Sequence, residues 1–577
     1  MNRAELTIVI LLCLLLMAWF YHEHVNSMTY RAKQSSLTKE SSLDDKINLD
    51  TTTNEIISIT SPVLRDTGHV EEEKTIAIEN QDMIVSITSW GGAIKNVTLK
   101  HYKANNIKDS PPLLLDFSNF PSLAYIGISG LSTNNDFELT SGEDGRTVNV
   151  FRKTDEGLIF TRTFTLNEKG YQINICDKIA LDNSLEAYEI PQHSISIGSM
   201  MLETSKVSSA GGVYLGVDTL AEAGGEGVHH WGSQIPALFG YKKSFFSCGS
   251  PKVYHGMPVY VTQNISNSVL WAAVKNKFFV QIVSPSLPAV DCTIVARRMI
   301  KSDNSFGIEW VGACLVLKGE KITPLHAYFR SIDCYIGPKL QSAVAGLGLH
   351  KEDVMEFGRL KWICNLLLQI MNKVYMVIPN YGVVIIILSL LVKGVFWPIT
   401  HKGAKSMKKM QEIQPEVNQI REKYKDKPQK MNQEIMELYR KHKINPMAGC
   451  LPLIVQLPVL FALFTVLRSA VELRFAPFLW IRDLSEPEGL FANILPIAIN
   501  ILPIMMTILT VIQQYLTPSS GDPNQKKMMM YMTFIMLFMF YNMASALVLY
   551  WTVNQFISTV GLLWQKYRQQ NIPALTS

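Results

Sequence analysis

The sequence predicts a multi-pass α-helical membrane protein with six spans and one large all-β domain inserted after the first span. Three observations carry this prediction. Of the 577 residues, 47% are apolar and only 18% are charged, and the charged residues leave five long gaps. Between the first two gaps, short runs alternate apolar and polar side chains. Lysine and arginine gather in short segments on one side of the predicted spans.

The charge-free gaps set the number of spans. A helix needs about 20 mostly apolar residues to cross a bilayer core. Three gaps, at residues 374–392, 444–467 and 489–521, each hold one span. A single helix over the last gap, 528–565, would run about 57 Å, nearly twice the hydrocarbon thickness. We therefore expect two short spans there, joined by a tight turn near residues 542–545.

The first gap, residues 6–22, has two interpretations. Its apolar core after Arg3 is compatible with a cleavable signal peptide. However, the core is followed by Trp19, Phe20 and Tyr21 rather than by a small-x-small cleavage site. A retained membrane anchor is therefore favoured, and it supplies the sixth span.

The distribution of lysine and arginine predicts the orientation. Segment 401–446 carries twelve basic residues against six acidic ones, which indicates the cytoplasmic side. Segment 469–488 has two basic residues against four acidic ones, so we expect it to lie outside. Both termini are then cytoplasmic, and residues 23 to about 355 lie outside.

The outer residues divide into a linker, a β domain and a helix. Residues 23–74 are rich in Ser, Thr, Asp and Asn, which is typical of a flexible linker. From residue 75 to 335, runs such as 158–164 alternate apolar and polar side chains and predict a β-sandwich. Apolar residues recur at helical spacing in 356–373, which predicts an amphipathic helix on the outer leaflet.

The cytoplasmic segment also has helical patterns. Apolar residues step by three and four through 407–424 and again through 431–438, with Asp426, Lys427 and Pro428 between the two sets. An antiparallel helical hairpin is favoured over two separate solvated helices.

These observations predict the following organisation along the chain: an N-terminal anchor (1–22), an outer linker (23–74), the β-sandwich (75–335), a connection with the interfacial helix (336–373), the second span (374–400), the cytoplasmic hairpin (401–446), the third span (447–468), an outer loop (469–489), the fourth span (490–516), a cytoplasmic loop (517–527), the fifth and sixth spans (528–565) and a cytoplasmic tail (566–577).

Several function classes are disfavoured. The net charge of +5 is too small and too dispersed for a nucleic-acid interface, so no specific nucleic-acid partner is expected. The sequence contains no Walker A motif, no HExxH, no GxSxG elbow and no GxGxxG after a strand. We therefore predict no catalytic residue, no cofactor and no metal site, and a protein that is not an enzyme.

The most informative residue is Lys393, inside the second span. A charge at the bilayer centre costs about 2.5–3.5 kcal/mol, so it normally faces a partner or a wet cavity. The alternative is snorkelling, in which the ammonium reaches the inner headgroups, and Lys393 alone does not decide between the two. Other polar side chains within the spans favour a hydrated, positively charged recess open to the cytoplasm: Ser389, Gln456, Asn500, Gln513, Asn554 and Gln555.

Several stretches of the sequence resemble the YidC-type membrane protein insertases. They are KGVFWPIT at 393–400, NPMAGCLPL at 445–453, QLP at 456–458, VELRFAPF at 471–478 and LVLYW at 547–551. The resemblance is specific from about residue 362 to 565. Gly337, Pro338 and Lys339 also resemble the Gram-negative branch, which has a large periplasmic domain.

This resemblance implies a fold and a function. The fold is a five-helix core with a hydrophilic groove open to the cytoplasm, a periplasmic β-sandwich and a mobile cytoplasmic hairpin. The function is insertion and folding of proteins in the bacterial inner membrane, alone or beside the Sec translocon. Lys393 is implied as the cation of the groove and Ser389 as its neighbour, while Tyr550 and Trp551 lie where substrate helices slide.

Two departures from the family pattern affect these expectations. The family usually has arginine where this chain has Lys393, so the charge is kept but bidentate recognition is lost. The turn before the sixth span usually contains proline and glycine, whereas here it reads MASA at 543–546.

Partners follow from the charges and from the resemblance. Nascent membrane proteins are the implied substrates, and basic side chains of the hairpin are expected to recruit these chains, ribosomes or anionic lipids: Lys405, Lys408, Lys409 and Arg421.

Two alternatives from other classes stay open. A secondary solute transporter predicts an internal repeat, which is not visible. A membrane-tethered carbohydrate-active enzyme needs a pair of carboxylates in the β domain.

Overall fold

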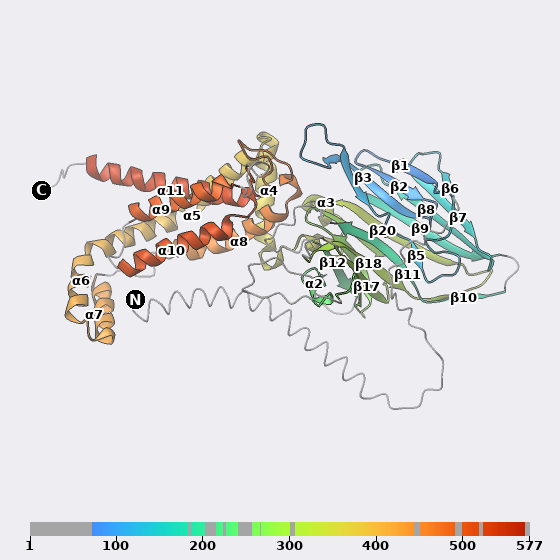
Figure 1. Cartoon of the computed structure of the whole chain (residues 1–577), viewed down its shortest axis with the longest axis horizontal. Helices are drawn as coiled ribbons and strands as arrows, with labels where there is room; N and C mark the ends of the chain where they lie inside the picture. Colours follow the sequence, from blue (N-terminus) through green and yellow to red (C-terminus); the bar gives the residue numbers. More distant parts are fainter. Residues whose placement is uncertain are drawn as a thin grey trace, which may run out of the picture.

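A computed structural model describes most of the chain after the linker. The described residues are 72–182, 186–201, 215–222, 227–240, 257–265, 267–299, 306–442, 451–490, 499–517 and 523–571. The predicted anchor (1–22) and the linker up to residue 71 lie outside the described residues. In Figure 1 the β domain and the helical part lie at opposite ends of the molecule, with the α4 region between them.

Two large antiparallel sheets form the body of the β domain. One has nine strands: β13 (His229–His230), β12 (Gly216–Ala221), β15 (Val269–Lys275), β16 (Phe279–Pro285), β20 (Tyr328–Pro338), β9 (Gln172–Leu181), β8 (Leu158–Leu166), β7 (Thr147–Lys153) and β6 (Glu138–Ser141). The other has five: β14 (Tyr260–Asn264), β17 (Asp291–Arg298), β18 (Ile308–Leu317), β11 (His193–Met201) and β5 (Tyr125–Ile126). β15 packs against β11 and β18 of the second sheet.

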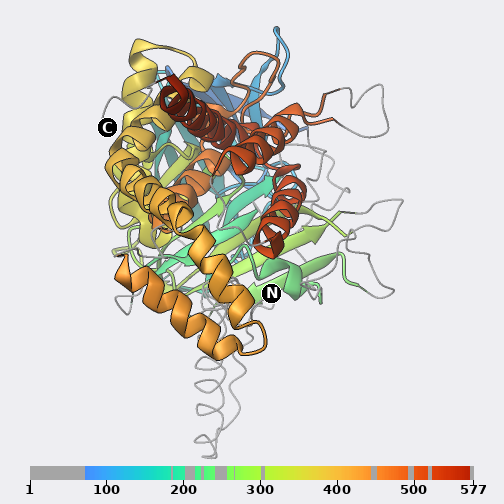
Figure 2. The same ribbon diagram turned by 90° about the vertical axis from the view of Figure 1, so that its left-hand side faces the viewer.

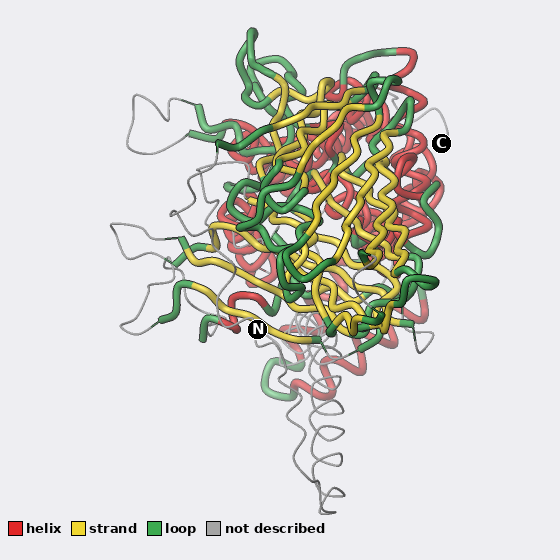
Figure 3. Tube along the Cα trace, turned by 90° about the vertical axis from the view of Figure 1, so that its right-hand side faces the viewer, coloured by secondary structure: helices red, strands yellow, loops and turns green. Residues whose placement is uncertain are grey.

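Two smaller sheets complete the domain. One contains β1 (Thr75–Glu79), β2 (Met83–Thr88), β3 (Ala93–Lys103) and β4 (Pro112–Asp116), and the other pairs β10 (Tyr188–Ile190) with β19 (Glu320–Ile322). Figure 3 shows the sheets in front of the helices. The β-rich domain is the predicted one, and its first described strand begins at Thr75.

Alternation of side chains explains why these segments become strands. In β9 and along most of β8, successive residues alternate between the buried core and the more exposed face. β16 departs from this pattern, because it is buried along its whole length and is covered on both faces. The core includes the fully buried Trp271 and Phe279 and continues into the helical part.

The helical part begins with short elements and continues with long ones. The helices are α2 (Ile235–Leu238), within the β domain, α3 (Gln341–Ala345), η1 (Lys351–Met355), η2 (Gly358–Leu360), α4 (Lys361–Val377), α5 (Tyr381–Glu412), α6 (Gln414–Lys423), α7 (Pro428–Lys441), α8 (Leu451–Ser469), η4 (Val471–Leu473), α9 (Ile501–Leu516), α10 (Pro523–Phe540) and α11 (Ser545–Asn571). Figure 2 shows the helical part in front of the sheets.

Length and apolar composition allow two described helices to cross a membrane, at Tyr381–Pro398 in α5 and Ser545–Trp564 in α11. Three shorter apolar stretches, in α8, α9 and α10, accompany them. The predicted count of six spans therefore stays a prediction. The run 528–565 is divided between α10 and α11 at residues 541–544, where the sequence predicts a turn.

The connection from the β domain to α4 has an unusual backbone. Leu349, His350 and Glu356 have φ values of 49°, 55° and 57°, in the left-handed region that costs energy for side chains other than glycine. Contacts with β15 hold this segment. Trp271 Nε1 donates to the Leu349 carbonyl at 2.8 Å, and Lys275 Nζ lies 2.6 Å from Glu356 Oε1.

Candidate functional site

The candidate site lies between α5 and α11. α11 packs against α5, α8 and α9, so its side chains face several helices. Lys393 of α5 is half-buried, and its Nζ donates to Ser558 Oγ of α11 at 2.5 Å. This contact joins the charged residue singled out in the sequence to a helix that begins about 150 residues later.

A row of polar side chains runs along α11. Tyr550, Asn554 and Ser558 are spaced by four residues and share one face of the helix. Ser558 Oγ donates to the Asn554 carbonyl at 2.8 Å, and Asn554 Nδ2 donates to the Tyr550 carbonyl at 2.9 Å. The side-chain amides of Asn554 and of Gln456 from α8 lie close to the buried Tyr550 hydroxyl. We name Lys393, Tyr550, Asn554 and Ser558 the polar row.

Two polar atoms of this row lack partners. Within the described part of the chain, Tyr550 Oη and Asn554 Oδ1 are buried without a hydrogen bond, as are Gln513 Oε1, Trp551 Nε1 and Thr559 Oγ1 elsewhere on α9 and α11. Each unpaired buried group costs about 1–3 kcal/mol. Entry of water would remove this cost, so the arrangement is suited to a hydrated face.

Two other residues predicted for the site differ in position. Ser389 lies one turn before Lys393 on the same face of α5, where it is fully buried and its Oγ donates to the Ile385 carbonyl at 2.8 Å. Asn500 precedes α9, where its Oδ1 accepts from Gly489 N at 2.8 Å and its Nδ2 donates to the Tyr541 carbonyl at 2.7 Å. Asn500 therefore belongs with the segments at the opposite ends of the helices from the hairpin, and the structure does not bring it to Lys393.

Sequence reasoning missed Ser558. A single serine in an apolar helix carries little signal, because serine often bonds back to its own helix. The signal that was available is its four-residue spacing from Asn554 and Tyr550. Gln555 contributes differently, since its Nε2 donates to Thr510 Oγ1 of α9 at 2.9 Å and so joins two helices.

The predicted substrate-sliding residues differ in burial. Tyr550 is fully buried, whereas Trp551 is half-buried and its ring lies 5.5 Å from the Phe540 ring. Trp551 therefore packs across the turn between α10 and α11.

The basic side chains of the predicted hairpin lie away from the β domain. α6 and α7 pack together at the far end of the helical part (Figure 1). Lys405 and Lys409 are exposed on α5, and Arg421 is half-buried on α6. The side chain of Lys408 lies outside the described residues.

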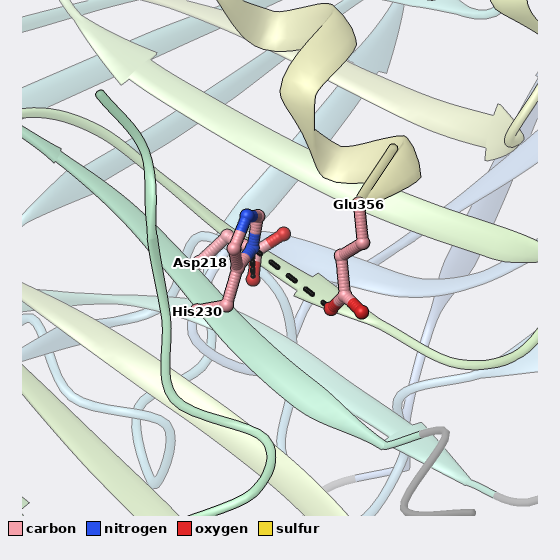
Figure 4. Close-up of side chains that lie close together, drawn as sticks. All are labelled: Asp218, His230 and Glu356. Atoms are coloured by element: carbon pink, nitrogen blue, oxygen red, sulfur yellow. Dashed lines mark hydrogen bonds and ion pairs between the residues drawn. The ribbon is translucent and has the colours of Figure 1, made fainter. Parts of the chain in front are cut away.

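One cluster in the β domain has the ligand types of a metal site. Asp218, His230 and Glu356 place three ligand atoms within 4.8 Å of one another (Figure 4). However, Lys275 Nζ lies 2.5 Å from Asp218 Oδ2 and 2.6 Å from Glu356 Oε1. The ammonium already pairs with both carboxylates, so we interpret the group as an ion-pair cluster. Burial, together with the nearby charge of Lys275, also lowers the pKa of Lys339 to about 7.

Comparisons with known proteins cover most of the chain. A family model described as 60Kd inner membrane protein matches residues 373–571, and one described as YidC periplasmic domain matches residues 75–210. A membrane protein insertase YidC of Pelobacter propionicus is 31% identical over 492 residues, which are 82% of this chain and 83% of the relative.

A second relative and a solved structure are similar over the same length. A membrane protein insertase YidC of Syntrophus aciditrophicus is 32% identical over 501 residues, covering 85% of this chain and 84% of the relative. A crystal structure of an active YidC insertase with its first transmembrane domain resolved matches 85% of this chain and 93% of its own, at 17% identity and a TM-score of 0.34.

Proposed function

The chain belongs to the YidC family of membrane protein insertases, and on that premise we propose that the polar row is the substrate groove of this insertase. The family is one of inner membrane proteins, and its members are insertases rather than enzymes. The solute-transporter and carbohydrate-enzyme alternatives find no support among these relatives.

The observation that carries this proposal is the Lys393–Ser558 contact beside unpaired polar atoms. A hydrated face between α5 and α11 shortens the apolar path that a polar segment of a substrate must cross. The Lys393 ammonium attracts acidic residues of that segment. The apolar segment then leaves sideways into lipid, where burial contributes about 25 cal/mol per Å² of apolar surface.

The topology and the partners complete the proposal. Six spans, cytoplasmic termini and a periplasmic β domain follow from the distribution of charges. The basic residues Lys405, Lys408, Lys409 and Arg421 recruit nascent chains, the ribosome or anionic lipid. The family resemblance adds the Sec translocon as a partner.

Charge reversal at Lys393 tests the groove. In a strain depleted of its own insertase, we expect Lys393→Glu to lower insertion of substrates with acidic translocated tails by about tenfold or more, because it repels them at close range. Lys393→Arg keeps the charge and is expected to retain insertion. Lys321→Glu, at an exposed position on β19 to which we assign no role, is the matched charge-reversal control.

Labelling gives a direct readout of hydration. A cysteine at position 393 in an otherwise cysteine-free chain should react with a water-soluble maleimide. A position that stays unlabelled, together with normal insertion by Lys393→Glu, would mean that the ammonium only snorkels and that the groove lies elsewhere.

A further inference from the structure

The described segment that follows α8, residues 470–490, has a fixed internal structure. Asp483 Oδ1 accepts hydrogen bonds from Phe475 N at 3.1 Å, Ser485 N at 2.8 Å and Ser485 Oγ at 2.7 Å. Phe478 and Ile481 are joined by backbone bonds in both directions. We name residues 470–490 the outer loop.

The outer loop accepts hydrogen bonds from groups at the start of two helices, α9 and α11. The N-terminal N–H groups of a helix have no partner within the helix. For α9, the Glu488 carboxylate accepts from Ile501 N at 2.5 Å and Leu502 N at 3.1 Å. For α11, the Glu486 carbonyl accepts from Ser545 N at 3.0 Å and Ser545 Oγ at 2.7 Å. The ends of α9 and α11 are therefore fixed to one loop.

The β domain holds the outer loop in turn. Lys277, between β15 and β16, places its Nζ 2.6 Å from Glu486 Oε1 and 2.9 Å from the Ser485 carbonyl. The Lys277 side chain is 12% exposed and the Glu486 side chain is 36% exposed, so this ion pair is partly shielded from water. Two further bonds join Arg474 Nη1 to the Lys103 carbonyl and Asn106 Nδ2 to the Arg482 carbonyl, at 2.6 and 2.9 Å.

These contacts form a continuous connection from the β domain to the polar row. Lys277 fixes Glu486, the Glu486 carbonyl caps α11 at Ser545, and α11 carries Ser558 about 20 Å further along its axis. A helix transmits rotation and displacement of its end to side chains further along, because its backbone is rigid over this length.

We propose that Lys277 and Glu486 are positioning residues, through which the β domain fixes the rotation and depth of α11 against Lys393. This inference rests on the proposed groove, because it assigns the ion pair a role in arranging that face. The β domain then acts as a clamp, by which we mean that its contacts fix the position of α11 beside the groove.

The test uses the full chain with charge reversals and their combination. Lys277→Glu and Glu486→Lys should each lower substrate insertion by about fivefold, the size expected for coupling between packed elements. The double variant restores the pair with reversed charges and should recover insertion. Lys321→Glu, an exposed position on β19, is the control and should behave like the unaltered chain.

A distance measurement separates positioning from mere stability. Spin labels at exposed positions 391 of α5 and 560 of α11 report the arrangement of the two helices. Each single reversal should broaden this distance distribution, and the double variant should narrow it again. Unchanged distances and insertion in both single variants would overturn the proposal, as would a double variant no better than the singles.

The same measurements distinguish the two proposals. Lys393→Glu should lower insertion without broadening the 391–560 distances. If Lys393 variants insert normally while Lys277→Glu still broadens the distances, the groove assignment fails and the clamp remains.

Discussion

His193 shows at the residue scale how burial makes the β domain sensitive to acid. The residue is 1% exposed. Its Nδ1 donates to the Pro191 carbonyl at 2.9 Å, and its Nε2 accepts from the Tyr328 hydroxyl, which itself accepts from Arg330 Nε. Burial, with a smaller contribution from the nearby Arg330 charge, lowers the pKa of His193 to about 4. The folded domain therefore holds a neutral imidazole.

The sign of the pH dependence follows directly. Between the unfolded pKa of 6.5 and the folded pKa of about 4, the unfolded chain binds more protons, so this stabilisation is present above pH 6.5 and is lost towards pH 4. Its full size is about 3 kcal/mol. Hydrogen exchange of β11 and β20, corrected for intrinsic rates, should show this loss. His193→Gln should reduce the dependence, whereas His326→Gln, at an exposed site, should keep it.

At the scale of elements, the helix boundaries depend on local interactions that cannot be inferred from the charge-free gaps. The sequence predicts the second span at 374–400, but α4 runs to Val377 and α5 begins at Tyr381. Pro379 interrupts the helix, and Asn380 Oδ1 accepts from Val383 N at 3.2 Å to start the next one. α5 then continues to Glu412 with Pro398 inside it, because the basic residues after 400 are good helix formers.

The start of α5 also gives a prediction about packing. Gly382 lies against Phe478 of the outer loop, and an added Cβ would come within 2.0 Å of the ring. Gly382→Ala should therefore destabilise the chain by about 1–3 kcal/mol through overpacking. Thermal unfolding in detergent measures this. Gly561→Ala, where a Cβ meets no atom within 4 Å, is the control and should not destabilise; equal effects of both variants would contradict the packing argument.

Strand existence was easier to predict than strand partners. Alternating side chains mark β8 and β9, which pair with each other and are close in sequence. β20, however, pairs with β9 through Tyr328 and Ile179, about 150 residues away. Such partners depend on which apolar faces fit together in three dimensions. The Lys393–Ser558 contact also depends on three-dimensional packing, so the sequence did not predict it. Lys393 and Asn554 were nevertheless recognisable as polar residues within apolar runs.

At the scale of the whole molecule, the β domain is expected to assist the helical part without being indispensable. Removing residues 80–320 leaves Lys393 and the polar row intact but removes Lys277. We expect insertion in a depleted strain to fall by about fivefold and not to vanish, because only the positioning contribution is lost. Complete loss of insertion by a deletion variant that still reaches the membrane and resists proteolysis would contradict this division of roles.

The left-handed backbone at Leu349, His350 and Glu356 links the course of α4 to the β domain. These conformations persist because Trp271 and Lys275 of β15 hold the segment. β15 is an inner strand of the nine-stranded sheet, so the connection keeps this shape only while that sheet is folded. The direction in which α4 leaves the β domain therefore depends on the folded state of β15.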